Sequence, residues 1–496
     1  MVTAREIRVE QLLIVGLVTR RVRRGRNHSH GHSLKLLDQP DHPFGRVRGR
    51  GLALQCNVRR HRARPSADNA QTTHLIIIFT IVIDTLGIGI LGPILPQLLG
   101  NPNSPHYLLG TEAAVGSGYI MFGFLVAVYP IMQFFATPIL GQLSDRYGRK
   151  PVLALSLAGT SLGYALFATG IVIRSIPLLF LARALDGITG GNLSVAQASI
   201  ADVTKPEDRT KNFGLIGAAF GVGFIVGPFL GGLLADPSVV SWFSASTPFW
   251  FAAILAAANT TQVLLQFDET NTHMRHVPMQ LLRGMANIAR AYAMPDLRTI
   301  FLTTFLFNMG FGFFISFFGL FLIHRFNFNE ARIGNFFAWV GVCAIFTQIF
   351  TTRRVAARFS EPQVLRLSLF GVASVMFVYL LAPAPLWLFV IAPVGSTFNG
   401  LSLANMSGLL SRSVAPQVQG EILGIGSKRQ ALAQYTPLCS GFIAASLTRL
   451  PPLSWLKIPS RCSMFLAWAT FATLYRPVRL AARARAPKRT KNRRAR

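Results

Sequence analysis

Three ionisable side chains lie inside strongly apolar stretches of the sequence. Asp84 stands in the segment IDTLGIGILGPILP at 83–96, and Arg183 and Asp186 stand in FLARALDGITGGN at 180–192. An acid within an apolar membrane helix is costly unless it is protonated, paired or hydrated. A carboxyl group that binds a proton on one side of a membrane and releases it on the other suits a proton-coupled antiporter. We therefore predict a proton-coupling role for Asp84; the simpler alternative is a structural pair with a buried arginine.

Arg183 and Asp186 are three residues apart, so they share one face of a helix. Two roles remain open for them. Arg183 could hold Asp84 ionised until a proton or a cation displaces it, or Arg183 and Asp186 could form a local pair that stabilises one conformation. We include both residues in the predicted proton-coupling set.

The segment GQLSDRYGRK at 141–150 combines glycines, one acid and several bases. Glycine permits tight turns and close packing, and an acid among bases can form an ion pair in one state that breaks in another. We predict a gating loop here, made of Gly141, Asp145, Arg146, Gly148, Arg149 and Lys150. The alternative is that the bases act only as topology signals.

A glycine-rich segment, GAAFGVGFIVGPFLGG at 217–232, strips side chains from a helix face. Small residues let membrane helices approach closely, and an internal proline removes a helix hydrogen bond. The segment suits either a smooth hinge or ordinary tight packing. Its predicted functional residues are Gly223, Gly227, Pro228, Gly231 and Gly232.

Several polar side chains fall within apolar segments, where they can line a cavity or bond between helices. The aromatic run FNMGFGFFISFFGLF at 307–321 offers an apolar wall, which together with a few polar groups suits amphipathic ligands. The candidate cavity residues are Gln133, Asn192, Gln197, Asn308, Phe311, Gln348, Asn399 and Asn405.

The amino-acid composition indicates that these segments lie in a membrane. Of the 496 residues 51% are hydrophobic and 14% are charged, against about 25% charged in soluble proteins. The apolar residues come in runs of about 20, the length of a membrane-spanning helix. We predict twelve spans, at 75–99, 117–141, 151–172, 176–200, 213–235, 249–266, 299–323, 332–352, 364–382, 385–410, 420–447 and 456–475.

Loop charges predict the orientation of these spans, and an internal repeat predicts how they are grouped. Basic residues concentrate in alternate loops, which the positive-inside rule places in the cytoplasm together with both termini. Residues 143–159 and 355–371 repeat at a constant offset, which indicates two six-helix halves. The predicted domains are a basic extension (1–74), an N-terminal half (75–266), a cytoplasmic linker (267–298), a C-terminal half (299–475) and a basic tail (476–496).

The net charge of +30 does not indicate a nucleic-acid partner. Residues 1–74 hold 15 bases and 5 acids, and residues 476–496 hold 10 bases and no acid, so two thirds of the excess lies in the tails. No nucleic-acid-binding motif accompanies them. The N-terminal extension could be a targeting segment, a lipid-attracted arm or a stretch wrongly joined to the chain, and we favour the last. The region 449–463 is also unusual, because it puts bases on the predicted outer side.

Four motifs in order resemble the major facilitator superfamily, and most closely its twelve-span drug:proton antiporters near the tetracycline/proton antiporters. They are the first-span D-x-x-G-x-G…P-x-x-P (Asp84, Gly87, Gly89, Pro93, Pro96), the 141–150 loop, the fourth-span Arg183 and Gly187, and G-x-x-x-G-P-x-x-G-G at 223–232. The resemblance covers about 75–447. The last motif is typical of exporters and counts against an uptake symporter.

Some positions depart from the tetracycline antiporter pattern. Gly163 stands where an aspartate is usual in the third span, Cys343 and Ala344 stand near the place of an eighth-span histidine, and Asp186 replaces a small or polar residue. Gln133 matches a polar second-span position. The resemblance therefore implies a broader drug or metabolite exporter rather than a tetracycline-specific one.

These observations predict an all-α polytopic membrane protein of the major facilitator fold. The expected function is a proton-coupled antiporter that exports small amphipathic molecules by alternating access. Alternatives are an uptake symporter or a transporter-like protein that acts as a sensor or is defective. The sequence shows no ATP-binding loop, catalytic motif or paired cysteines, so we expect no enzyme activity, cofactor or metal. Protons, a small-molecule substrate and the lipid bilayer are the expected partners of a monomer in the plasma or inner membrane.

Overall fold

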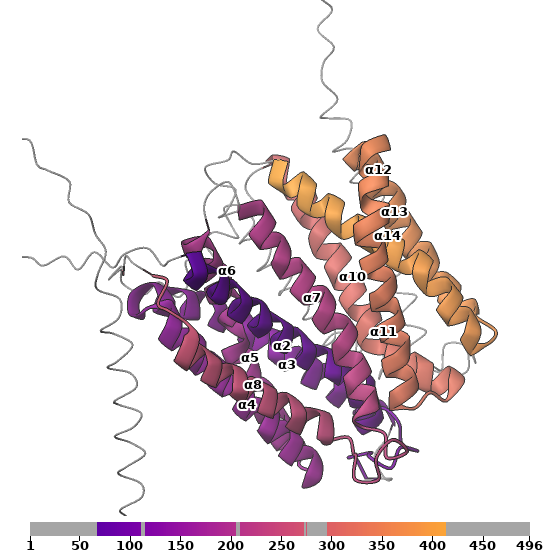
Figure 1. Cartoon of the computed structure of the whole chain (residues 1–496). Coiled ribbons are helices and arrows are strands. Elements are labelled where there is room, and N and C mark those ends of the chain that lie inside the picture. The colour runs from indigo at the N-terminus through magenta and orange to yellow at the C-terminus, as the bar shows by residue number, and fades with distance from the viewer. Residues whose placement is uncertain (1–66, 111–114, 205–208, 272–273, 275–294, 413–496) are drawn as a thin grey trace, which may run out of the picture. The chain divides into compact units, whose positions relative to one another are not determined.

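The computed structural model describes residues 67–110, 115–204, 209–271, 274 and 295–412 (Figure 1). Within these ranges the chain forms helices and no strand. The predicted spans at 420–447 and 456–475, both basic tails apart from 67–74, the region 449–463 and most of the linker lie outside the described residues.

The helices before the linker follow the predicted spans closely. Their bounds are α2 (Ala67–Leu99), α3 (Val115–Tyr147), α4 (Arg149–Val172), α5 (Ile176–Thr189), α6 (Leu193–Val203), α7 (Arg209–Leu233) and α8 (Thr247–Gln266). The predicted fourth span is interrupted, because the 3-10 turn η1 (Gly190–Asn192) separates α5 from α6. Two consecutive glycines at Gly190 and Gly191 weaken the α-helix at this point.

The helices after the linker also match their predicted spans. They are α10 (Pro295–Phe326), α11 (Glu330–Phe346), α12 (Thr352–Arg358), α13 (Glu361–Leu381) and α14 (Pro385–Arg412), with the π-helical turn η3 (Thr347–Thr351) between α11 and α12. A capping box of Ser360 and Gln363 begins α13. Nine of the described helical segments are long and apolar enough to cross a membrane.

Polar side chains inside the spans are mostly satisfied by their own helix. Thr80 donates to Ile76 O at 3.0 Å and Thr85 donates to Ile81 O at 2.7 Å. Such bonds to the carbonyl one turn earlier remove the cost of a hydroxyl in an apolar setting. Thr80 Oγ1 also accepts a hydrogen bond from Asn259 Nδ2 of α8 at 3.0 Å, so a hydroxyl satisfied within α2 also links α2 to α8.

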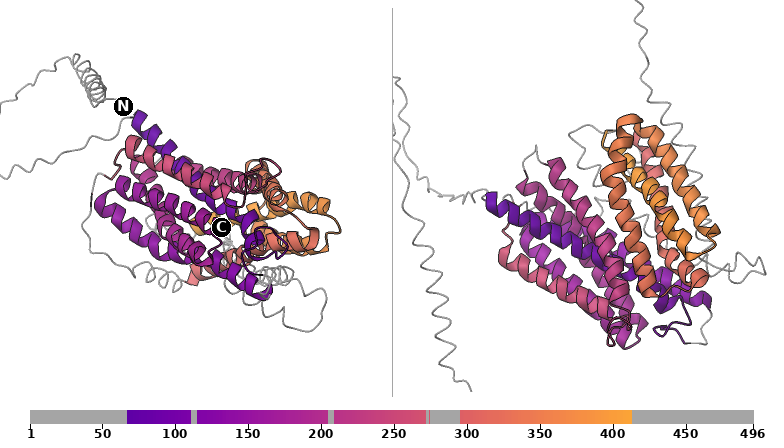
Figure 2. Two further views of the ribbon diagram at one scale, coloured as in Figure 1. Left: turned by 90° about the horizontal axis from the view of Figure 1, so that it is seen from below. Right: turned by 45° about the vertical axis from the view of Figure 1, so that its right-hand side comes forward.

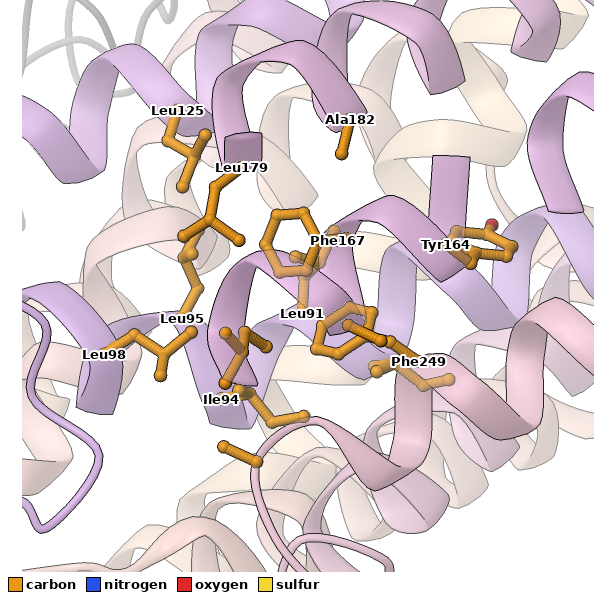
Figure 3. Packing of buried hydrophobic residues seen from close by; sticks show 14 of the residues in the cluster. Leu91, Ile94, Leu95, Leu98, Leu125, Tyr164, Phe167, Leu179, Ala182 and Phe249 are labelled. Atoms are coloured by element: carbon orange, nitrogen blue, oxygen red, sulfur yellow. The ribbon is translucent and has the colours of Figure 1, made fainter. Parts of the chain in front are cut away.

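Apolar packing holds the helices before the linker together. α2 packs most extensively against α7, and α4 packs against both α5 and α8; the views in Figure 2 show α2 and α7 running side by side. Figure 3 shows the buried cluster between α2, α3, α4, α5 and α8, in which Phe167 and Phe249 lie 4.5 Å apart between ring centroids. This packing fixes the backbones that carry Asp84, Arg183 and Asp186.

Candidate functional site

Asp84 lies in α2 as a half-buried residue whose carboxyl group forms no ion pair among the described residues. Its Oδ1 is buried and has no hydrogen-bond partner among the described residues. The side chain of Asn192 in η1 lies close to this carboxyl group, but both polar atoms of Asn192 also lack a well-formed hydrogen bond within the described structure. A carboxyl group held in this way can bind or release a proton without first breaking an ion pair.

Arg183 and Asp186 form a buried ion pair on α5. Arg183 Nη1 lies 2.9 Å from Asp186 Oδ2, and the two residues are 6% and 4% exposed. The Arg183 guanidinium carbon also lies 4.5 Å from the centroid of the Tyr129 ring, which is a cation–π contact. Of the two roles left open by the sequence, the local pair is the one formed in this conformation.

Tyr129 is itself braced by Gln133, one turn further along α3. Gln133 Nε2 donates to Tyr129 Oη at 3.0 Å and to Gly190 O at 2.8 Å. The bond to Gly190 O joins α3 to the turn η1. Gln133 therefore links the break in the fourth span to Tyr129, whose ring contacts Arg183. The sequence left Gln133 as either a cavity residue or an interhelical bonding residue, and it did not single out Tyr129. The available signal was a tyrosine inside an apolar span, four residues before a glutamine.

Tyr164 of α4 completes the polar cluster. Its hydroxyl group lies against the backbone of α2 at Gly87, where a Cβ would collide with it, and it is close enough to Asp84, Asp186 and Arg183 to interact with their charges. Figure 3 shows Tyr164 at the edge of the apolar cluster. The structure thus brings Asp84, Arg183, Asp186, Asn192 and Gln133 together with two tyrosines that the sequence did not single out.

Gly163 lies directly beside the acid of α5. A Cβ at Gly163 would stand 3.2 Å from Asp186 Cβ and 3.4 Å from Asp186 N. The helices α4 and α5 therefore meet at a point where only one of the two positions can carry a large side chain. In this chain the acid is on α5.

The predicted gating loop is a turn of one residue rather than a loop. α3 continues to Tyr147 and α4 begins at Arg149, so Gly148 alone lies outside the helices, with φ of 104°. Glycine adopts this left-handed conformation without strain. Arg149 Nη1 lies 2.7 Å from Asp145 Oδ1, and Arg149 Nε lies 3.1 Å from Asp202 Oδ2 at the end of α6.

Burial and the charge of Arg149 shift the pKa of Asp202 in opposite directions. Removal from solvent raises the pKa of this carboxyl group above its ordinary value, whereas the hydrogen bond and charge of Arg149 lower it. Arg149 therefore has two acidic partners on different helices, and the pair with Asp145 lies within a segment that the sequence identified. The partner on α6 was not predicted, because it is 53 residues away.

A second clamp on this turn comes from the residues after α8. The Glu269 carboxylate accepts hydrogen bonds from the backbone nitrogens of Arg149 at 2.8 Å and Lys150 at 3.1 Å, which caps the start of α4. Asn271 Nδ2 donates to Asp145 O at 3.1 Å, near the end of α3. The sequence placed these residues in the linker without a role.

The glycine-rich motif of α7 faces two helices at once. A Cβ would lie 2.7 Å from Leu86 O at Gly227 and 2.9 Å from Ile90 Cα at Gly231, both on α2. At Gly232 it would lie 2.6 Å from Glu330 O on α11, and Pro228 contacts Gly89 and Gly334. Gly223 lies against Thr85, one residue after Asp84. Close packing is therefore visible, and the hinge role stays a prediction.

The remaining cavity candidates are spread over several helices. Asn308 and Asn405 donate to Thr304 O and Leu401 O in their own helices, and Asn399 has a buried Oδ1 without a partner in the described structure. Gln348 is exposed in η3 and accepts from Thr352, and Gln197 is half-buried in α6. Phe311 stacks on Phe307 at 6.1 Å between centroids.

The comparisons with known proteins agree with each other. The profile of the Major Facilitator Superfamily matches residues 77–434. The chain is 32% identical to tetracycline resistance protein, class H, of Pasteurella multocida over 80% of this chain and 95% of that protein. It is 28% identical to multidrug resistance protein 1 of Bacillus subtilis (strain 168), over 75% of this chain and 89% of that protein.

Solved structures share the fold at low sequence identity. The structure of a bacterial homologue of the human lysosomal transporter Spinster, inward-facing and unoccupied, has a TM-score of 0.66 and 15% identity, covering 84% of this chain and 98% of that one. The human organic anion transporter MFSD10 has a TM-score of 0.60 and 21% identity, covering 82% of this chain and 99% of that one.

Proposed function

Because the chain belongs to the major facilitator superfamily, we propose that it is a proton-coupled antiporter that exports small amphipathic molecules by alternating access. The family and the helices confirm the prediction of an all-α polytopic membrane transporter that is not an enzyme. The prediction of two halves, 75–266 and 299–475, forms part of the proposal. So do the plasma or inner membrane location, the cytoplasmic termini, the monomeric state and the proton gradient as the energy source without a cofactor.

One observation carries the proposal: Asp84 has a buried oxygen without a partner in the described structure, while Arg183 is paired with Asp186. A cation close to a carboxylate would fix it in its charged form. In this conformation Arg183 is instead held by Asp186 and the Tyr129 ring. Asp84 is therefore the group proposed to exchange a proton, and Arg183 and Asp186 are proposed to tune that exchange.

The coupling follows from linkage between the two ligands. Proton and substrate drive each other if each weakens the binding of the other at a shared site. Asp84 stands in the helix that the α7 glycines contact, so a change at Asp84 reaches the packing between α2 and α7 directly. The Asp145–Arg149–Asp202 group and Gly148 are proposed to hold the gating turn in one of the two states.

The substrate class rests on the relatives and the apolar lining. Relatives of this chain carry the names tetracycline resistance protein and multidrug resistance protein. On α10 the aromatic Phe311 and the amide Asn308 are both half-buried, next to a buried aromatic core, and a mostly apolar surface with few polar groups suits such ligands. We propose amphipathic drugs or metabolites as a class, with tetracycline as one member to be tested.

The test uses inside-out membrane vesicles with an acid interior. Lipophilic cations, organic anions and tetracycline are added in turn, and a fluorescent dye reports the interior pH. We expect at least one compound to trigger proton release that is absent in Asp84→Asn vesicles with equal protein content. Asp145→Asn serves as the control for an acid at the gating turn, and it should slow release without abolishing coupling. Equal release in Asp84→Asn vesicles would exclude the proposed role of Asp84.

A further inference from the structure

Two side-chain hydrogen bonds join helices before the linker to residues after it, one in α10 and one in the connection between α10 and α11, at the same end of the spans. Gln97 Nε2, near the end of α2, donates to Phe328 O at 3.0 Å. Tyr119 Oη, near the start of α3, lies 2.8 Å from His324 Nε2, near the end of α10. Both contacts lie at the ends opposite Gly148, which we call the outer end, in line with the predicted topology.

The contact between α7 and α11 loosens away from the outer end. A Cβ at Gly232 would lie 2.6 Å from Glu330 O. At Gly221, three turns nearer the gating turn, the closest described atom would be Ile345 Cγ1 at 3.9 Å. At Gly217 no described atom would lie within 4 Å. The two helices are thus in backbone contact at the outer end and separate towards the inner end.

Tyr119 and His324 differ in their access to solvent. Tyr119 is 2% exposed, whereas His324 is exposed. The two rings meet edge-on, with centroids 6.1 Å apart and planes at 75°. Deeper in the same seam Phe122 meets Phe317 edge-on at 5.3 Å. A polar bond at the rim therefore stands above an apolar contact, and the buried hydroxyl has His324 as its partner.

We propose that the Tyr119–His324 bond, seated on Phe122 and Phe317, latches the outer gate of this protein. It must break before the Asp84 site can open to the outer side. Neither residue contacts Asp84 in the described structure, so they set access and do not take part in the proton chemistry. The inference rests on alternating access, which is part of the proposed function.

Removing the latch shifts the equilibrium between the inward-open and outward-open states by the free energy that one hydrogen bond contributes. A net contribution of about 1 kcal/mol corresponds to a shift of about fivefold. Tyr119→Phe and His324→Ala are each expected to raise the outward-open population by about twofold to tenfold. Tyr379→Phe is the matched control, because Tyr379 is also buried, at 5% exposed, and contacts only residues after the linker in the described structure.

Access is measured with a reporter cysteine at Gly92. This residue lies in α2 between Asp84 and Gln97, and a Cβ there would meet no described atom within 4 Å. Cells carrying full-length Gly92→Cys are treated from outside with a charged, membrane-impermeant thiol reagent. The same chain without Gly92→Cys gives the background labelling.

The expected result is faster labelling in Tyr119→Phe and His324→Ala and an unchanged rate in Tyr379→Phe. The double variant should label no faster than His324→Ala, since the Tyr119–His324 bond is already lost in each single variant. Unchanged labelling in both single variants, an equal increase in Tyr379→Phe, or additive effects would overturn the latch. The labelling rate does not depend on proton coupling, so the two proposals can fail separately. Proton-linked transport that persists in Asp84→Asn would refute the proposed proton site. The latch would still be judged by the labelling rates alone.

Discussion

The helices before the linker and the described helices after it have different interiors. The first group encloses Asp84, the Arg183–Asp186 pair and two tyrosines among apolar side chains. The second group encloses an aromatic cluster in which Phe318 contacts Phe314, Phe336 and Tyr379, with centroids 4.8 to 5.3 Å apart. Its described polar amides largely bond within their own helices.

This difference indicates a division of labour. A charge inside a membrane is expensive and is kept where it acts, whereas an aromatic wall can accept many apolar ligands. We infer that the first group exchanges the proton and the second group contributes the surface for the substrate. The following variants test that division, beginning with the largest expected effect.

Breaking the buried ion pair should damage the first group most. In Asp186→Asn the Arg183 guanidinium loses its charged partner, and an uncompensated buried charge costs about 3–5 kcal/mol. The double variant Arg183→Met with Asp186→Leu removes both charges and should recover most of that stability. Thermal unfolding of the purified proteins in detergent measures both. If the single and double variants unfold at the same temperature, the pair has no structural role.

Recovery of stability should not bring recovery of transport. The double variant leaves Asp84 without the neighbouring charges that are proposed to tune it. We expect proton-linked transport to stay low in the double variant even when the protein is stable. Normal transport in that variant would move Arg183 and Asp186 out of the coupling set.

Filling the contact between α7 and α2 should have the next largest effect. Gly227→Ala puts a Cβ 2.7 Å from the Leu86 carbonyl oxygen, which belongs to a backbone that cannot move aside. Overpacking of this kind costs about 1–3 kcal/mol. Gly217→Ala, on the same helix, meets no described atom within 4 Å and is the control. Equal thermal stability of the two variants would contradict the packing described here.

At the gating turn the expected loss is smaller. Gly148→Ala forces a side chain into a left-handed conformation and against the Glu269 carboxylate, at a cost of about 1–2 kcal/mol. Gly141→Ala meets only Ser194 Oγ, at 3.7 Å, and should be neutral. Transport rates and melting temperatures of both variants test this turn. A Gly148→Ala protein that matches Gly141→Ala in both would rule out the clamp.

The smallest effect is expected in the aromatic group. Phe311→Leu removes one stacked ring, worth about 1 kcal/mol, and leaves every charged group in place. The apparent affinity for an exported compound should change severalfold, and the number of protons moved per substrate should stay the same. Dose–response curves for transport and for proton release in the same vesicles measure the two quantities. A change in the number of protons moved per substrate would contradict the proposal that the two groups of helices have separate roles.

The sequence predicted the helices well and the contacts between them poorly. Long apolar runs determine where a span begins and ends, so α4, α8 and α14 lie close to their predicted bounds. The break at Gly190–Asn192 was missed, because flanking apolar residues masked a turn that Gln133 and Ser194 stabilise by hydrogen bonds to Gly190 O and Gly191 O. Motif residues at 141–150 were identified, but their helical state was not, since polar residues at a membrane surface can form either a helix or a loop.

Partners far apart in the chain could not be predicted from one sequence. Asp202 and Glu269 approach Arg149 only after α6 and α8 have packed, and His324 reaches Tyr119 across 205 positions. Nothing in their local sequence distinguishes them from other polar residues at the ends of spans. Asp84 was different, because an acid within an apolar run is conspicuous wherever its partners lie.

The most direct test of the account is proton release from the purified protein on substrate binding. A compound that drives proton exchange in vesicles is added to protein in weakly buffered detergent solution, and a pH dye counts the protons released per bound molecule. The account predicts release by the wild type and by Phe311→Leu, and none by Asp84→Asn at saturating compound. Release by Asp84→Asn equal to that of the wild type would contradict it and place the coupling proton on another residue.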